Sequence, residues 1–421
     1  MHVVPRKTVS YNDGSITLFR VDGVWNYSSM LLREDLGLLL LGAREAVYGL
    51  DLRNISRKTA EVGLATQRRT TPQCPFGHPS RCLCVGLLSS AVFVPQVQWA
   101  VTQDKQAECT DKGKTLTYEG GQLLLLNTTE DGKGICPYDP YQRYSSLMVD
   151  GAIYSATAMN FLGSEMALQR KFNKILKTHN ILLLFYEPQF VSMVEVPESV
   201  GNVEGDDDKV YLFFSEIAVE YDFSSKLAVS RVARVCKKDK GGQRILQKKW
   251  TSFLKARLDC PVLESSLPFL VQDVFLWRDS DWRNSVFYAV FTPQSASVDL
   301  SAVCAYSVTA VGDVFSKGKF KTPVTVETSH TKWVMYSGEL PVPRPGACID
   351  NTAKQMGIMT TLDLPDKVLQ FVQTQPLMDP AVEPLSGRPL LVKRGAAFTR
   401  IVVDRVTALD GQNYTVMFVG T

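Results

Sequence analysis

Three cysteines and one histidine in a short segment have side chains that can bind zinc. Cys74, His78, Cys82 and Cys84 form the pattern C-x3-H-x3-C-x-C, and thiolates and imidazoles are the usual zinc ligands. The surrounding residues contain several prolines and no apolar period that would build a core around a metal. Because a structural zinc site folds together with its metal, we interpret this cluster as accidental and predict no metal site.

Histidines could also serve as general bases, and the sequence contains His2, His78, His179 and His330. A Ser-His-Asp or Cys-His mechanism requires a histidine beside its nucleophile. None of the four lies in a strand-turn-helix context of the nucleophile-elbow type, Gly-x-Ser-x-Gly does not occur, and no glycine loop suits phosphate. The sequence therefore predicts a protein that is not an enzyme and has no cofactor.

Three consecutive carboxylates, Asp206, Asp207 and Asp208, are the remaining candidate cation ligands. A calcium loop needs further oxygen ligands at fixed spacing, and these are absent. We therefore interpret the three aspartates as a solvated turn before a strand that begins near Val210.

The composition of the 421 residues is that of a folded protein, with 45% hydrophobic and 21% charged residues. Lysine and arginine total 46 against 43 acids, and the net charge of +3 does not favour nucleic acid as a partner.

We find no signal peptide at the start and no apolar run long enough to span a membrane. Nine cysteines leave one unpaired if the protein is secreted. Four asparagines lie in glycosylation sequons: Asn26, Asn54, Asn127 and Asn413.

The elements that would position these residues are mostly strands. Short β-branched and aromatic runs at 38–41, 46–50, 152–156, 210–214, 229–235, 286–291, 301–306 and 414–418 are separated by turn residues. The pairs Asp150-Gly151 and Asp410-Gly411 are typical of tight hairpins. Many short strands on a chain of this length favour a large antiparallel all-β domain, and a propeller over a sandwich.

Two segments depart from this pattern. Pro365 followed by Asp366 and an apolar stripe of Val368, Leu369 and Val372 predicts a helix. Residues 243–258 are ambiguous, but the alternation at 254–258 favours a strand with Lys255 and Arg257 on the polar side.

Several blocks resemble the Sema domain of the semaphorin family. The strongest are RVARVC at 231–236 and KWTSFLKARL at 249–258; others are NYSSMLL at 26–32, LGAREAVY at 41–48, DGKGICPYDP at 131–140, DDDKVYLFF at 206–214 and PRPGAC at 343–348. The details EYDF at 220–223 and QKKW at 247–250 are similar to class 4 members. The resemblance covers roughly residues 25–60 and 130–421, in the order of the family.

The resemblance implies a seven-bladed β-propeller, secreted, that binds plexin receptors and forms a homodimer. It implies disulfides between Cys236 and Cys348 and between Cys260 and Cys304. It also places Phe223 near the dimer contact, with filling of the core as the alternative. The helix after Pro365 resembles the plexin-facing edge, so that the receptor-facing candidates are Gln370, Gln373 and Gln375; a surface helix without a partner is the alternative.

The chain also departs from the family. Residues 62–96 are an aperiodic insert, and we expect the strands of an early blade to be missing near 115–126. Members of the family continue beyond residue 421 with more strands, so we expect 1–421 to be one incomplete Sema domain.

The resulting prediction is an extracellular or cell-surface ligand for a plexin of the B type or a relative, which carries guidance or repulsion cues between cells. Full-length relatives are anchored in the membrane. The alternatives are a receptor-side propeller like that of plexins and, as a weaker hypothesis, a propeller hydrolase.

Overall fold

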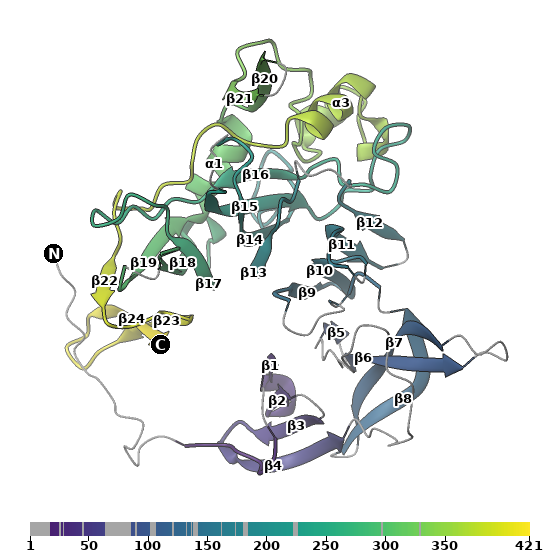
Figure 1. Ribbon diagram of the computed structural model, residues 1–421, viewed down its shortest axis with the longest axis vertical. Coiled ribbons are helices and arrows are strands. Elements are labelled where there is room, and N and C mark those ends of the chain that lie inside the picture. The colour runs from purple at the N-terminus through teal and green to yellow at the C-terminus, as the bar shows by residue number, and fades with distance from the viewer. Residues whose placement is uncertain are drawn as a thin grey trace. The chain divides into compact units, whose positions relative to one another are not determined.

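The computed structural model describes residues 17–24, 27, 29–43, 46–63, 86–88, 91–101, 107–119, 122–131, 133–135, 137, 142–160, 162–172, 174–179, 184–221, 226–295, 298–327 and 330–421. Strands dominate these residues, which confirms the predicted all-β class (Figure 1). The chain forms two compact units, Val4–Asn173 and a second one that consists mainly of Lys174–Thr421.

The first sheet of the unit Val4–Asn173 has four antiparallel strands in chain order. They are β1 (Ser29–Arg33), β2 (Leu38–Gly42), β3 (Ala46–Asp51) and β4 (Asn54–Gly63), with the short helix η1 (Glu34–Leu36) between β1 and β2. The Ala43 N–H, directly after β2, donates to the carbonyl of Ala46, the first residue of β3. Leu41, Tyr48 and Leu50 form the core of this sheet.

The second sheet of this unit contains β5 (Gly86–Leu88), β6 (Ala91–Val101), β7 (Ala107–Glu119) and β8 (Gln122–Asp131). Strands β7 and β8 cover residues 115–119 and 122–126, where β-prone runs lie on either side of a Gly-Gly pair. The expectation that this region lacks strands which the family has in an early blade stays a prediction. Part of the insert interpreted as aperiodic, 86–88 and 91–96, is also strand.

Three further strands of this unit, β9 (Ser145–Val149), β10 (Ala152–Ala158) and β11 (Met166–Lys171), pair antiparallel. Asp150 and Gly151 between β9 and β10 have φ angles of 47° and 76°. Positive φ at both positions is the geometry of the type I′ turn, so the predicted hairpin is confirmed.

The second unit begins with β12 (Ile175–Lys177), followed by the sheet of β13 (Gln189–Val196), β14 (Lys209–Ile217), β15 (Ala228–Cys236) and β16 (Leu254–Arg257). Almost every residue of β14 and β15 is buried, so both strands are covered on two faces. The strand predicted at 254–258 is confirmed, and 243–253 form turns and not a helix.

The next sheet contains β17 (Leu270–Trp277), β18 (Val286–Thr292), β19 (Leu300–Ser307) and β22 (Leu391–Arg394), with η2 (Trp282–Asn284) before β18. A long insertion separates β19 from β22. It consists of α1 (Val308–Lys317), the hairpin of β20 (Lys321–Glu327) and β21 (His330–Met335), α2 (Asn351–Gln355), η3 (Thr361–Asp363) and α3 (Asp366–Thr374). In Figure 1 the hairpin and helices α1 and α3 lie together, beyond β16.

The insertion shares one apolar core with the sheets of this unit. Val232 of β15, Phe287 of β18, Val311 of α1 and Val368 of α3 belong to the same buried cluster. The insertion is therefore part of the folded unit and not an appendage.

The chain ends in the hairpin of β23 (Arg400–Thr407) and β24 (Asn413–Gly420), which confirms the strand predicted at 414–418. Ile401 and Val403 pack on Val286 and Val290 of β18. The Ile401 N–H donates to Asp273 Oδ2 of β17 at 2.9 Å, so the hairpin is attached to the sheet by backbone and side chain.

Candidate functional site

Helix α3 carries the three glutamines that the sequence singled out. Pro365 is its N-cap, and Asp366 lies in the first turn, where a carboxylate is favourable to the helix dipole. Val368, Leu369, Phe371 and Val372 are buried, which confirms the predicted helix and its apolar stripe. Because the apolar face of α3 is buried, only the opposite face is available to a partner.

Aromatic contacts set the orientation of this helix. The Phe371 ring lies edge-to-face between Phe320 and Tyr336, with ring centroids 5.0 and 5.1 Å apart. The Arg344 guanidinium lies 4.8 Å above the Phe320 ring. Such contacts add to the free energy of burial and fix relative geometry, so α3 cannot turn without breaking them.

The segment after α3 is bonded to β16. The Lys255 N–H donates to the Pro376 carbonyl at 2.8 Å, and the Met378 N–H donates to the Lys255 carbonyl at 2.9 Å. Further along, the Val382 N–H donates to the Arg257 carbonyl at 2.7 Å. The C-terminal end of α3 therefore depends on the position of β16.

A buried charge network joins β14, β15 and β16. Glu216 Oε1 accepts from Arg231 Nε at 2.8 Å and from Lys255 Nζ at 2.5 Å, and Arg231 Nη2 donates to Glu220 Oε2 at 2.6 Å. The side chains of Arg231, Lys255 and Glu216 are fully buried. The sequence pattern places Lys255 on the polar side of its strand. Its side chain is nevertheless fully buried, so this side of the strand does not face solvent.

The pKa values in the network follow from burial and from the neighbouring charges. Burial acts to lower the pKa of Arg231, but Glu220 and Glu216 outweigh it and raise that pKa. Burial lowers the pKa of Lys255, although Glu216 opposes the shift. Burial acts to raise the pKa of Glu220, and Arg231 outweighs it so that the pKa is lowered. Charged residues within otherwise apolar strands were the signal that sequence reasoning passed over.

The three glutamines differ in their surroundings. Gln370 is exposed, whereas Gln373 and Gln375 are half-buried. Gln373 Nε2 lies 3.3 Å from His179 Nε2, and Gln375 Oε1 is buried and accepts no hydrogen bond from the described residues. Of the three candidates, Gln370 presents its side chain most fully.

Two disulfides join segments that are distant in sequence. Cys236, at the end of β15, bonds to Cys348 before α2, with 5.6 Å between the Cα atoms. Cys260 bonds to Cys304 of β19, with 5.9 Å between the Cα atoms. These are the two pairings that the resemblance implied.

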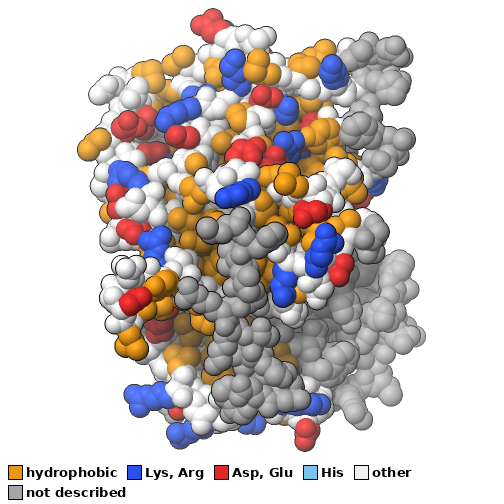
Figure 2. Space-filling model, turned by 90° about the vertical axis from the view of Figure 1, so that its left-hand side faces the viewer, with side chains coloured by type: hydrophobic (Ala, Val, Ile, Leu, Met, Phe, Trp, Pro, Cys, Tyr) orange, Lys and Arg blue, Asp and Glu red, His pale blue; other side chains and the backbone are white. Residues whose placement is uncertain are grey.

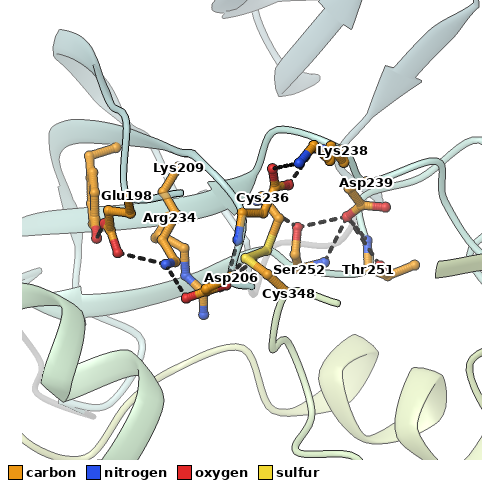
Figure 3. The surroundings of a disulfide bond; sticks show 12 residues. Glu198, Asp206, Lys209, Arg234, Cys236, Lys238, Asp239, Thr251, Ser252 and Cys348 are labelled. Atoms are coloured by element: carbon orange, nitrogen blue, oxygen red, sulfur yellow. Dashed lines mark hydrogen bonds and ion pairs between the residues drawn. A yellow bond between two sulfur atoms is a disulfide. The ribbon is translucent and has the colours of Figure 1, made fainter. Parts of the chain in front are cut away.

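The aspartates before β14 are paired and not solvated, so the prediction of a solvated turn is wrong. Asp206 Oδ2 accepts from Lys209 Nζ at 2.6 Å, and Asp208 Oδ1 accepts from Ser199 Oγ at 2.6 Å. Asp207 is 4% exposed and accepts from the Lys238 N–H. Figure 3 shows Asp206, Lys209 and Lys238 beside the Cys236–Cys348 bond. Among the described residues, no group of three or more His, Cys, Asp or Glu side chains could hold a metal ion.

The remaining candidate residues are spread over the chain. Asn54 and Asn413 are exposed, and Asn127 lies in β8. Outside the described residues lie Asn26, Phe223, Cys74, His78, Cys82 and Cys84. On the face drawn in Figure 2, acidic and basic side chains are interspersed, in agreement with the small net charge. No helix in the described part of the chain is long and apolar enough to cross a membrane.

Comparison with curated proteins finds semaphorins. The model of the Sema domain matches residues 271–421. Semaphorin-4D of Mus musculus is 45% identical over 421 residues, which are 99% of this chain and 48% of the relative. Semaphorin-4C of Mus musculus is 40% identical over 433 residues, 100% of this chain and 50% of the relative. The chain thus spans about half the length of the curated relatives that it matches.

Solved structures give the same result for the fold. Drosophila Semaphorin 1a, extracellular domains 1-2, is similar with a TM-score of 0.71 and 29% identity, over 94% of this chain and 73% of that chain. One chain in the structure of Drosophila Plexin A in complex with Semaphorin 1b is similar with a TM-score of 0.70 and 28% identity, over 94% of this chain and 72% of that chain. The four-stranded antiparallel sheets of this protein are accordingly those of a β-propeller.

Proposed function

Because this chain belongs to class 4 of the semaphorin family, we propose that it is an extracellular ligand for a plexin receptor of the B type or a relative. The observation that carries this proposal is the similarity, over 94% of the chain, to a structure of Drosophila Plexin A in complex with Semaphorin 1b. The two disulfides support secretion, since such bonds persist in oxidising compartments. Family membership favours a ligand over the receptor-side alternative.

In this proposal, the exposed face of α3 contacts the receptor. Phe371 and the bonds from the segment after α3 to β16 fix the helix before any partner binds. A preformed surface loses little conformational entropy on association. Gln370 offers an amide to the partner, and Gln373 and Gln375 complete the contact at its edge.

Signalling then depends on geometry and not on turnover. We propose that residues 1–421 belong to one Sema domain and that two copies associate through a contact near Phe223. A dimer would hold two receptors together, and the second contact would gain from the effective concentration that the first creates. The outcome would be a guidance or migration cue, with Asn26, Asn54, Asn127 and Asn413 as glycan sites.

Binding of the secreted chain to immobilised plexin ectodomains, with the mass of the complex recorded on the same sample, tests the proposal. We expect saturable binding by a dimer. Gln370→Glu places an unpaired charge in the contact and should weaken binding at least about tenfold, because an uncompensated interfacial charge costs about 2 kcal/mol or more.

Gln412→Glu, in the exposed loop between β23 and β24, is the matched control. It makes the same chemical change outside α3 and should leave receptor binding unchanged. Equal binding by the Gln370 variant and the control would remove α3 from the interface, and absence of binding to every plexin tested would refute the receptor assignment.

A further inference from the structure

A pocket of about 190 Å³ lies next to the Cys236–Cys348 disulfide, away from the glutamines of α3. Three segments form its walls: the loop before β14, the loop after β15 and the segment that contains α2 and η3. The lining residues are Gly205, Asp207, Cys236, Lys238, Asp239, Lys240, Ile349, Lys354, Met359, Thr360 and Thr361. All belong to the second unit, and none has a role in the receptor contact proposed above.

Bonds between the walls keep this pocket formed. The disulfide joins the loop after β15 to the segment before α2. Thr361 Oγ1 donates to the Gly241 carbonyl and accepts from the Lys240 N–H, both at 2.9 Å. The Asn351 N–H donates to the Glu204 carbonyl at 2.8 Å. A pocket attached on every side is preformed, which is typical of binding sites.

The two carboxylates of the pocket differ in what they bind. Asp239 Oδ2 accepts from the N–H and the hydroxyl of both Thr251 and Ser252, and its Oδ1 accepts from the Gly241 N–H (Figure 3). Asp207 Oδ1 is buried and accepts no hydrogen bond from the described residues; its nearest cation, Lys238 Nζ, lies 3.6 Å away. The floor therefore contains one buried acceptor whose hydrogen-bonding capacity no described residue uses.

The rim of the pocket is basic. Lys238, Lys240 and Lys354 are exposed, so the lysines outnumber the two carboxylates, of which Asp239 is saturated with hydrogen bonds. The three lysines would repel an ammonium or guanidinium group that approached Asp207. A ligand that combines an anionic group with a neutral N–H or O–H donor fits both parts.

Apolar side chains next to the rim indicate which class of ligand the pocket binds. Met359 is 62% exposed and lines the pocket, and Met356 and Leu362 are exposed close to it in the chain. Methionines adapt to varied apolar partners. None of the described residues that line the pocket is aromatic, so a sugar ring would have no stacking platform. A peptide with both acidic and apolar side chains matches this surface better than a glycan.

From these features we propose that the pocket binds an acidic peptide segment of a partner protein. A glutamate or aspartate carboxylate of the segment pairs with the rim lysines. A peptide N–H donates to Asp207 Oδ1, and an apolar side chain of the segment covers Met359. The association weakens as ionic strength rises, because the paired charges lie at the exposed rim.

Fluorescence polarisation with the full chain and a labelled, end-blocked peptide of alternating leucine and glutamate tests the proposal. The double variant Lys240→Glu, Lys354→Glu should bind this probe roughly tenfold more weakly or worse at low salt, since each reversal turns an attraction into a repulsion. The same peptide with glutamine in place of glutamate should bind weakly to both proteins.

The matched control is Lys317→Glu, Lys393→Glu, which has the same net charge and changes exposed lysines that do not line the pocket. It should bind the probe like the unmodified chain. Equal affinities for the two double variants, or for the two peptides, would overturn the proposal. Lysine-dependent binding of a sialylated oligosaccharide without peptide binding would assign the pocket to glycans instead. Since the probe contains no receptor, these outcomes are independent of plexin binding.

Discussion

Replacing Glu216 by glutamine should strongly destabilise the second unit. Glu216 is fully buried, and Oε1 accepts from both Arg231 Nε and Lys255 Nζ, while Oε2 accepts from the Tyr186 N–H at 3.2 Å. Glutamine preserves the shape of the side chain and removes its charge. Arg231 then keeps its ion pair with Glu220, whereas Lys255 loses the charge of its partner Glu216.

The magnitude follows from the cost of an uncompensated buried charge. Removing one partner of a buried ion pair costs about 3–5 kcal/mol of unfolding free energy. For a unit of this size, each kcal/mol lowers Tm by about 2–4 °C, so a loss near 4 kcal/mol predicts a decrease of roughly 8–16 °C. Because the segment after α3 is bonded to the backbone of Lys255, the proposed binding of a receptor to α3 should weaken as well.

Thermal unfolding of the purified chain, followed by circular dichroism, measures this effect. Glu187→Gln is the matched control: Glu187 pairs with Lys226 at the surface, with both side chains more than half exposed, so Tm should hardly change. The double variant Glu216→Gln, Lys255→Met leaves Arg231 with Glu220 as a balanced pair and should recover most of the lost stability.

Two results would refute the reasoning. One is a Tm for Glu216→Gln that matches that of the surface control. The other is a double variant whose losses simply add, since the cost would then not arise from an unbalanced charge. Either outcome would indicate that water reaches the network and screens it.

Two other predictions concern the same unit. Replacing Cys236 and Cys348 together by alanine should cost about 5 kcal/mol, because their bond closes a loop with a sequence separation of 112, and urea unfolding measures this loss. Burial, with the charge of Lys249, holds the pKa of His179 below its ordinary 6.5. The unfolded chain therefore binds this proton more tightly, so stability should fall as pH decreases from 7 to 5, and His179→Gln should reduce that dependence in urea unfolding.

Elements with strong local signals could be predicted from the sequence. The helix after Pro365 has its cap, its first-turn acid and its apolar stripe within nine residues, and the hairpin at Asp150-Gly151 depends on two adjacent φ angles. Both are decided by neighbours in the chain, so a single sequence is sufficient.

Residues whose surroundings come from distant segments could not be predicted. Lys255 alternates with apolar neighbours as on a half-exposed strand, yet it is buried because Glu216, from β14, balances its charge and residues 376–382 cover its strand. Asp207 lies in a segment of turn-forming residues, which predicts exposure. It is buried because it accepts a hydrogen bond from the N–H of Lys238, a residue of the next loop. The disulfide pairings came from the resemblance alone, because cysteine spacing does not select a partner.

The long insertion between β19 and β22 has a consequence for synthesis. β22 completes its sheet only after residues 308–390 have been translated, which takes on the order of ten seconds at cellular rates. During that interval β19 is an open edge whose N–H and carbonyl groups could pair with another nascent chain. Cys304 lies on this strand, and its bond to Cys260 can form before β22 is made. Early formation of the Cys260–Cys304 disulfide would therefore restrict the movement of β19 and reduce pairing of its open edge with another chain.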